Sequence, residues 1–218
     1  MVIWPTLDNA DTLGVILLNK YKVPPDWYDR AIISHNIFHR FWHIKRLKTL
    51  ISLLSGFNGL ILDVGCDGGT LSSIIKQDSV WIVGIDIDMN AIKYATIKRK
   101  HHAWILADAH YLPFKNKSFN IVLCIETLEH CYSPRSVIEE IKRVTRSEIL
   151  ILIPNSSSPI FKIIWYVWLK LKGRVWIDSH LHEFNDRTIK KLFNDCGLKV
   201  FLMKRTLLGM LLAYKLRE

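Results

Sequence analysis

Cysteine is scarce in this sequence, and long apolar runs are missing. The four cysteines are scattered and form no CxxC pair: Cys66, Cys124, Cys131 and Cys196. That usage fits a reducing cytoplasm better than a disulfide framework. The longest apolar run covers residues 163–169, whereas a membrane-spanning helix needs roughly 20 such residues. Because Asp8 and Asp11 stand where a signal peptide would be basic or apolar, we expect a cytoplasmic protein.

Repeats and low-complexity segments are also absent. Of the 218 residues, 50% are apolar and 23% are charged, a balance that excludes disordered chains. A chain of this length builds its own core, as one domain or as one domain with an appendage. The net charge of +10 suits nucleic acid, an anionic membrane surface, anionic substrates or simple solubility. Charge alone does not choose among these partners.

Apolar spacing predicts one helix and then an alternating α/β pattern. Residues 30–55 carry apolar side chains at three- and four-residue steps, and Gly56 follows. Strands at 60–64, 80–85, 103–106, 120–125 and 148–153 then alternate with helices at 71–76, 90–100 and 136–145. A helix at 186–196 precedes strands at 199–204 and 209–215, which are predicted to pair antiparallel at the sheet edge. The pattern predicts an α/β, doubly wound, mostly parallel sheet.

A glycine-rich turn joins the first predicted strand to the helix after it. Residues 61–71 include Asp63, Gly65 and Gly69, and glycines let a ligand approach the backbone where a Cβ would clash. About 20 residues later, Asp86 ends the second strand, where an acid accepts both hydroxyls of a ribose. An adenosine-type ligand across the two strand ends is therefore predicted. The alternative is a tight turn that binds nothing.

The spacing of these glycines disfavours two common nucleotide sites. Counted from Gly65, the second and third glycines of a dinucleotide fingerprint would fall at Asp67 and Thr70. A GxxxxGK[ST] phosphate loop is absent as well. The sequence therefore disfavours a dehydrogenase and a nucleoside triphosphatase.

On these residues the chain resembles the class I S-adenosylmethionine-dependent methyltransferases, of the small-molecule type related to ubiquinone and menaquinone methyltransferases. Asp63, Gly65 and Gly69 match the family's D/E-x-G-x-G-x-G motif, and Asp67 departs from it at the middle glycine. The resemblance covers about residues 59–215. It implies a Rossmann-like, seven-stranded sheet with an antiparallel last strand, plus an N-terminal helical extension.

The resemblance also implies how S-adenosylmethionine is held. Its methionine end is expected against Gly65 and Cys66, and its ribose on Asp86. Residues 107–114 resemble the family's GDA-x-x-LPF stretch, in which Asp108 would accept from the adenine amino group. The expected cofactor-binding residues are Asp63, Gly65, Cys66, Gly69, Asp86, Ile87, Asp108, Ala109 and Ile125.

A candidate base follows the fourth predicted strand. Residues 118–122 resemble the family's SFDVV stretch, and residues 125–130 resemble its LEH signature. His130 is the first candidate for the catalytic base that a hydroxyl acceptor needs, since histidine titrates near neutral pH. Glu129 would orient His130 or cap the next helix. The alternative is a structural role, with His130 hydrogen-bonded to a loop carbonyl.

Further histidines lie at two other places. Residues 180–184 resemble the family's H-x-x-x-F stretch, which places His180 and His182 on the substrate side and on one face if extended. Residues 180–183 offer three candidate ligands, but zinc sites usually draw ligands from two separated segments, so no metal is expected. A ladder with four-residue steps, typical of a solvated or lid-facing stripe, is formed by His35, His39 and His43.

A basic aromatic segment follows the fifth predicted strand. Residues 160–176 hold Trp165 and Trp168 among three lysines and one arginine, with no acid. This composition is typical of a helix in a membrane interface. We expect a small-molecule or lipid-like acceptor, bound against Trp165 and Trp168 by a protein in peripheral contact with an anionic membrane. The equal alternative is a lid that packs its aromatic side chains on the pocket.

The expected domains are an N-terminal helical extension or lid at 1–56 and a methyltransferase domain at 57–218, with a substrate-side insert at 155–178. Two other classes remain open. Basic charge suits an RNA methyltransferase, although the [D/N]-P-P-[Y/F] motif of base-amino enzymes is missing at residues 124–127, so nucleic acid is the less favoured partner. A non-catalytic cofactor-binding protein is the third class, and the nearly complete cofactor motifs argue against it.

Overall fold

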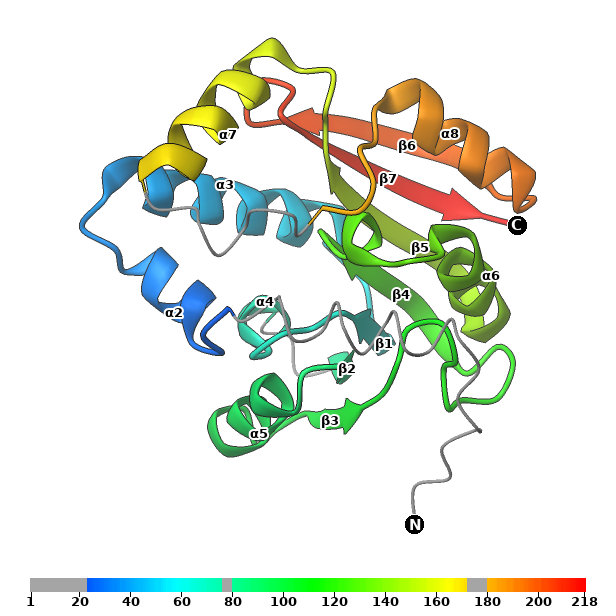
Figure 1. The fold of residues 1–218 in the computed structure, drawn as a ribbon. Coiled ribbons are helices and arrows are strands. Elements are labelled where there is room, and N and C mark those ends of the chain that lie inside the picture. Colours follow the sequence, from blue (N-terminus) through cyan, green and yellow to red (C-terminus); the bar gives the residue numbers. More distant parts are fainter. Residues whose placement is uncertain (1–22, 76–79, 172–179) are drawn as a thin grey trace.

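The computed structural model describes residues 23–75, 80–171 and 180–218 (Figure 1). One sheet has the strand order β3-β2-β1-β4-β5-β7-β6. Its strands are β1 (Gly59–Val64), β2 (Val80–Asp86), β3 (Ala103–Leu106), β4 (Phe119–Ile125), β5 (Thr145–Pro154), β6 (Lys199–Thr206) and β7 (Leu211–Arg217). The helices are α2 (Trp27–Ile32), α3 (Ile37–Leu53), α4 (Thr70–Ile74), α5 (Met89–Lys98), the 3-10 helix η1 (Leu128–His130), α6 (Pro134–Val144), α7 (Pro159–Leu171) and α8 (Asp186–Asp195). No helix of the described segments is long and apolar enough to cross a membrane.

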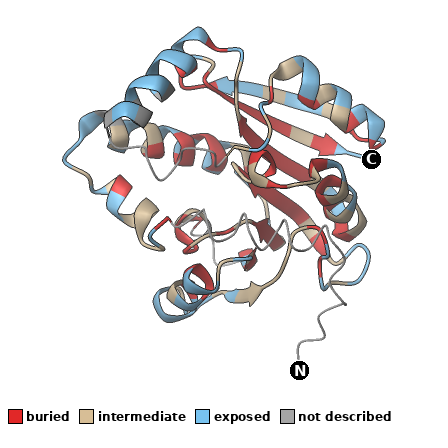
Figure 2. Ribbon diagram, viewed as in Figure 1, coloured by how far each residue is buried: buried red, intermediate tan, exposed pale blue. Residues whose placement is uncertain are grey.

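Helices cover both faces of the sheet. Ile141 of α6 and Phe193 of α8 belong to one buried cluster with the strands, and Leu50 and Leu54 of the α3 side belong to a second. Figure 2 shows the central strands buried and the outer faces of the helices exposed. Strands enclosed on both faces need continuous apolar sequence, which β5 supplies in residues 149–153.

Strand β7 is the antiparallel member of the sheet. The pairs β1–β2, β1–β4, β2–β3 and β4–β5 are parallel, whereas β7 runs antiparallel to both β5 and β6. The predicted seven-stranded, mostly parallel sheet is therefore confirmed. The predicted antiparallel pairing of the last two strands is confirmed as well, with β7 lying between β5 and β6.

The prediction of a single helix at 30–55 is wrong, because two helices, α2 and α3, occupy that stretch. Helix α2 ends at Ile32, and α3 begins after Asn36, whose side chain accepts a hydrogen bond from the His39 N–H at 3.1 Å. The Ser34 hydroxyl accepts from the Asn36 N–H in turn. Polar side chains that hydrogen-bond to the nearby backbone compete with helix formation. The apolar spacing in the sequence therefore continues across residues where the helix itself is interrupted.

The same break leaves His35 outside α3. The Nε2 atoms of His39 and His43 lie 3.2 Å apart in a hydrogen bond, and His43 is only 6% exposed. Burial, together with the charge of Arg46 and the neighbouring His39, lowers the pKa of His43 from its usual 6.5 to about 2. The solvated alternative of the predicted stripe is therefore wrong for His43, which is a buried, neutral side chain, and the lid-facing alternative stays a prediction.

Candidate active site

The loop after β1 turns back against the end of β2. The N–H groups of Gly65 and Cys66 both donate to the Ile85 carbonyl at 2.9 Å. Gly65 and Gly69 have φ angles of +73° and +74°, and Asp67 between them has φ of +47°. Aspartate and asparagine tolerate this left-handed conformation better than other non-glycine residues. Asp67 therefore adopts a glycine-like backbone at the position where the family motif has glycine.

Close packing is a second reason why glycine is required at Gly65 and Gly69. A Cβ on Gly65 would lie 2.3 Å from Thr127 Oγ1, and a Cβ on Gly69 would lie 2.5 Å from the Trp104 ring. The Thr127 hydroxyl donates to the Val64 carbonyl at 3.2 Å. The glycine loop is thus held against the segment that follows β4.

Acidic side chains gather around this loop. Asp86 accepts hydrogen bonds from the N–H of Asp67 at 2.8 Å and of Asp88 at 2.9 Å. Burial raises the pKa of Asp86, and burial together with the Asp86 charge raises the pKa of Asp67 well above its ordinary range. Burial and the charges of Asp86, Asp63 and Asp67 likewise raise the pKa of the Cys66 thiol. The loop disfavours further negative charge and favours a cationic ligand.

Strand β3 places another acid beside Asp86. The Ala107 N–H donates to the Asp86 carbonyl at 3.0 Å, and Asp108 follows directly. Asp108 Oδ1 accepts from the His110 N–H at 2.9 Å and lies 2.6 Å from His110 Nδ1. Although burial raises it, the pKa of Asp108 is held below its usual value by these hydrogen bonds. The adenine contacts of Asp108 and Ala109 stay a prediction, and His110 is the residue that orients the carboxylate.

Two predicted cofactor residues differ in their surroundings. Ile87 directly follows Asp86 and is 39% exposed, as a side chain open to a ligand should be. Ile125 is buried in the same core cluster as Leu123 and Leu150. The structure therefore gives Ile125 a packing role, and its cofactor contact stays a prediction.

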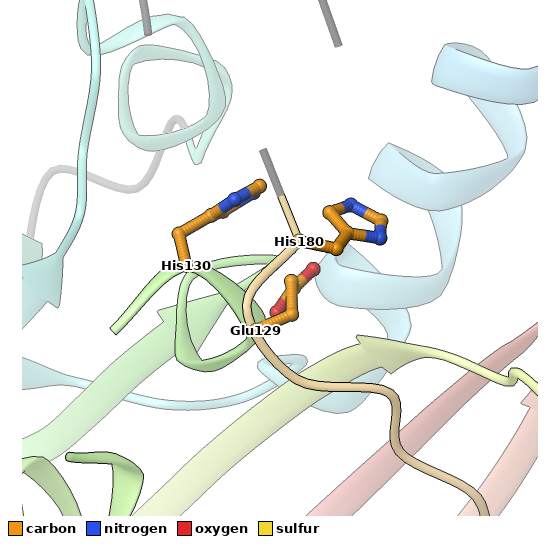
Figure 3. A group of neighbouring side chains, drawn as sticks. All are labelled: Glu129, His130 and His180. Carbon is orange, nitrogen blue, oxygen red and sulfur yellow. The ribbon is translucent and has the colours of Figure 1, made fainter. Parts of the chain in front are cut away.

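Glu129, His130 and His180 gather beyond the end of β4 (Figure 3). Glu129 and His130 lie in η1, whereas His180 lies in the loop before α8. One ligand-capable atom of each residue lies within 4.8 Å of the other two. The rings of His130 and His180 meet edge to face, with centroids 5.0 Å apart. Two predicted catalytic residues and one predicted substrate residue thus share one site.

Glu129 carries a buried carboxylate. The residue is 2% exposed, and among the described residues neither carboxylate oxygen has a hydrogen-bond partner. Burial raises the pKa of Glu129 to about 8. The Glu129 backbone carbonyl accepts from the N–H groups of Leu181 and His182, at 2.8 and 3.1 Å. These two bonds fix the loop that carries His180 against η1.

Among the described side chains, His182 does not belong to this group of three. The His182 ring stacks on Phe184, with centroids 6.0 Å apart, whereas His180 lies beside His130. The side chains of Trp165 and Trp168 lie outside the described part of the structure. Helix α7, which carries them, exposes a row of apolar side chains: Ile160, Ile163, Ile164, Tyr166 and Val167.

Sequence reasoning missed Arg46, which lies on α3. Arg46 is 1% exposed, and its Nη1 donates to the Glu126 carboxylate. Its guanidinium carbon lies 4.5 Å from the centroid of the Tyr28 ring. An arginine beside an apolar helix stripe is usually solvated, and no local signal marks its partner 80 residues away.

Helix α2 packs on the glycine loop. Asp29 accepts hydrogen bonds from three side chains: Tyr94 at 2.6 Å, Arg99 at 2.5 Å and Thr70 at 3.0 Å. The Pro25 carbonyl would lie 2.0 Å from a Cβ on Gly68. The described part of the N-terminal extension is therefore joined to the loop that is expected to hold the cofactor.

Known proteins share both the motifs and the fold. Residues 62–153 match the family model described as a methyltransferase domain. An uncharacterized protein of Methanocaldococcus jannaschii is 26% identical over 80% of this chain and 67% of its own length. The demethylmenaquinone methyltransferase of Lactococcus lactis is 26% identical over 78% of this chain and 77% of its own length. The chain spans only 46% of the malonyl-[acyl-carrier protein] O-methyltransferase of Hamiltonella defensa, at 27% identity over 57% of this chain.

Solved structures agree with the observed fold. A S-adenosylmethionine-dependent methyltransferase of Thermotoga maritima superposes with a TM-score of 0.70 at 16% identity, covering 92% of this chain and 98% of that chain. The magnesium protoporphyrin IX methyltransferase of Synechocystis, solved with S-adenosylhomocysteine, has a TM-score of 0.67 at 15% identity, covering 94% of both chains. At these identities the likeness is one of fold.

Proposed function

Since this chain belongs to the class I S-adenosylmethionine-dependent methyltransferase family, we propose that it methylates a small, lipid-like acceptor. The observation that carries the cofactor assignment is the group of acidic side chains around the loop after β1, in a protein of net charge +10: Asp63, Asp67 and Asp86. S-adenosylmethionine supplies an electrophilic methyl group on a sulfonium, and its two positive charges outweigh its one carboxylate. Buried carboxylates suit this ligand and would repel the phosphates of a nucleotide.

The residues around the loop fit the parts of this ligand. The turn at Gly65 and Cys66 would receive the methionine end, because glycine permits close approach of the backbone. Asp86 would accept the ribose hydroxyls, since each carboxylate oxygen keeps a lone pair beside the one bonded to a backbone N–H. Asp108 and Ala109 would bind the adenine edge.

The chain contributes to catalysis mainly by positioning. A methyl transfer is an in-line displacement, and well-oriented groups gain effective molarities of roughly 10⁵–10⁸ M. Thr127 links the loop at Gly65 to η1, so the cofactor site and the pair Glu129–His130 are held by one short segment. Glu129 and His130 therefore belong to the acceptor side of the reaction.

The acceptor class is supported by helix α7. Ile163 is 66% exposed and Val167 is 46% exposed, with Lys162 and Lys170 on the same helix. Apolar side chains flanked by lysines suit the boundary between lipid headgroups and acyl chains. The relative from Lactococcus lactis is named for demethylmenaquinone, which agrees with an apolar acceptor.

Calorimetric titration with S-adenosylmethionine tests the cofactor assignment. We expect micromolar binding of S-adenosylmethionine and S-adenosylhomocysteine, no binding of NAD, and loss of binding in Asp86→Ala. Asp88→Asn is the matched control, because asparagine can still cap α5 through the Asn90 N–H while the neighbouring charge is removed. Absence of binding by the wild-type protein would contradict the proposal and favour a non-catalytic role.

A further inference from the structure

Two segments that are distant in the sequence converge on one point (Figure 3). Helix η1 brings Glu129 and His130, and the loop before α8 brings His180, with one ligand-capable atom of each within 4.8 Å of the others. In a tetrahedral zinc site with bonds of about 2.0–2.1 Å, neighbouring ligand atoms lie roughly 3.3 Å apart. Side-chain movements on the order of 1 Å would bring the ligand atoms from within 4.8 Å of one another to the zinc-site spacing.

The backbone already holds this arrangement. The N–H groups of Leu181 and His182 donate to the Glu129 carbonyl at 2.8 and 3.1 Å. His180 is the next residue toward the N-terminus, so its position relative to Glu129 and His130 is set by main-chain bonds. A ligand set held in this way needs little ordering when it binds an ion.

The buried carboxyl group of Glu129 lacks a hydrogen-bond partner among the described residues. Both carboxylate oxygens of Glu129 are buried without a hydrogen-bond partner in the described segments. Buried polar groups in proteins are normally hydrogen-bonded or coordinate a metal ion. Arg46 acts on Glu129 from a distance, but its Nη1 already donates to Glu126. The charge of Arg46 is therefore balanced by another residue.

We propose that Glu129, His130 and His180 bind a divalent transition-metal ion, best zinc. Two imidazoles and one carboxylate suit zinc and related first-row ions, whereas Mg²⁺ and Ca²⁺ favour oxygen ligands throughout. Three protein ligands leave a coordination position for the acceptor. Residues 180–183 alone predict no metal site, because zinc sites usually draw ligands from two separated segments. In the folded chain, η1 is the second segment.

The metal site stands on this geometry, and its role in the reaction rests on the proposed methyl transfer. A bound divalent ion lowers the pKa of a coordinated hydroxyl. The hydroxyl proton leaves to water, and the acceptor oxygen forms the new C–O bond. The C–S bond breaks with its electron pair staying on sulfur, which yields S-adenosylhomocysteine. With a hydroxyl acceptor, the product of this step is a methyl ether.

Metal titration tests the site without turnover. The full chain is freed of any purification tag and stripped of metal with EDTA. It is then titrated with ZnCl₂, with CoCl₂ and with MgCl₂ in separate experiments. We expect one equivalent of zinc, visible absorption bands of tetrahedral cobalt, and no heat with magnesium. Glu129→Gln and His180→Ala should each bind zinc about 100-fold more weakly or worse. His182→Ala, which alters a histidine of the same loop that lies outside the cluster, should bind as the wild type does.

Two outcomes would overturn the metal site. One is zinc binding that persists unchanged in both Glu129→Gln and His180→Ala, and the other is no zinc binding by the wild-type protein. Thermal melts in EDTA identify a variant that fails to fold, and His130→Asn replaces it in the series. Titration of the same proteins with S-adenosylmethionine separates the two proposals. If the wild-type protein binds the cofactor but not zinc, the metal site alone is contradicted. If the wild-type protein does not bind the cofactor, the proposed function is contradicted.

Discussion

Arg46 of α3 and Glu126 at the end of β4 form an ion pair between side chains that are 1% and 14% exposed. Glu126 has a φ angle of +51°, a conformation that a non-glycine residue keeps only when its surroundings determine it. Helix η1 begins two residues later. The pair therefore connects the N-terminal extension to the segment that carries Glu129 and His130.

Removing one partner of this pair should destabilise the protein strongly. Glu126→Gln should lower the free energy of unfolding by about 3–5 kcal/mol, because it leaves the Arg46 charge buried and uncompensated. Arg46→Met combined with Glu126→Gln should recover part of that loss, since no buried charge remains. Urea unfolding followed by circular dichroism measures both. The single variant Arg46→Met completes the comparison. If the stability loss of the double variant equals the sum of the losses of the two single variants, the two side chains are not coupled.

Alanine should be tolerated less well at Gly65 than at Gly56. The φ angles are nearly equal, +73° and +75°, so both substitutions carry the same left-handed cost of about 1–2 kcal/mol. A Cβ on Gly65 would meet Thr127 at 2.3 Å, whereas a Cβ on Gly56 meets nothing within 4 Å. Overpacking should add about 1–3 kcal/mol at Gly65 alone.

Urea unfolding of the two alanine variants measures this difference, and S-adenosylmethionine titration should show a loss of affinity for Gly65→Ala only. Equal stability losses at both positions would mean that the contact with Thr127 relaxes without cost.

Acid should weaken the binding of S-adenosylmethionine. Because the pKa values of Asp67 and Asp86 are raised, these groups take up protons at a higher pH than ordinary carboxylates do. A cationic ligand binds the deprotonated form, so its binding releases protons and its affinity falls as the pH falls through the raised pKa values. Calorimetry between about pH 8 and pH 5 measures the slope.

Two comparisons isolate the carboxylates in that experiment. Asp67→Asn keeps a residue that tolerates the left-handed backbone and should flatten the pH dependence. S-adenosylhomocysteine lacks the sulfonium charge and should show a smaller slope than S-adenosylmethionine. Identical slopes for both ligands in both proteins would assign the pH dependence to other groups.

A charge on the exposed face of α7 should weaken membrane binding. Ile163→Asp should reduce sedimentation with anionic vesicles roughly tenfold or more, because an isoleucine side chain contributes about 1.5–3 kcal/mol on leaving water. Ile97→Asp on α5 is the matched control, since both isoleucines are 66% exposed. An equal loss of vesicle sedimentation in the two variants would indicate a nonspecific charge effect. It would favour the alternative in which α7 is a lid that packs on the pocket.

Much of the sheet could be predicted because buried strands are continuously apolar. The bounds predicted for β3 match the observed Ala103–Leu106, and β1 and β2 each differ from prediction by a residue at one end. The glycine loop was predictable for a similar reason, since its turn and its acid at Asp86 are local features. The break between α2 and α3 was not, because capping by Asn36 overrides the apolar spacing.

The group formed by Glu129, His130 and His180 could be predicted only in part. The motif at 125–130 marks Glu129 and His130, and the stretch at 180–184 marks His180. That His180 rather than His182 reaches the first pair depends on the backbone bonds to Glu129, which join residues about 50 positions apart. Arg46 carries no local signal, since only the folded chain brings its partner to it. Spacing reports local geometry, whereas convergence of segments depends on the tertiary structure.

The position of β7 also constrains how the molecule is made. Strand β6 precedes β7 in the chain, yet it joins the sheet only through β7. Until residues 211–217 emerge from the ribosome, the edge of β5 is bare, with Ile149 to Ile153 fully apolar beside unpaired backbone groups. Such an edge recruits other strands. Pairing of β7 with β5 is therefore what covers this apolar edge of the sheet.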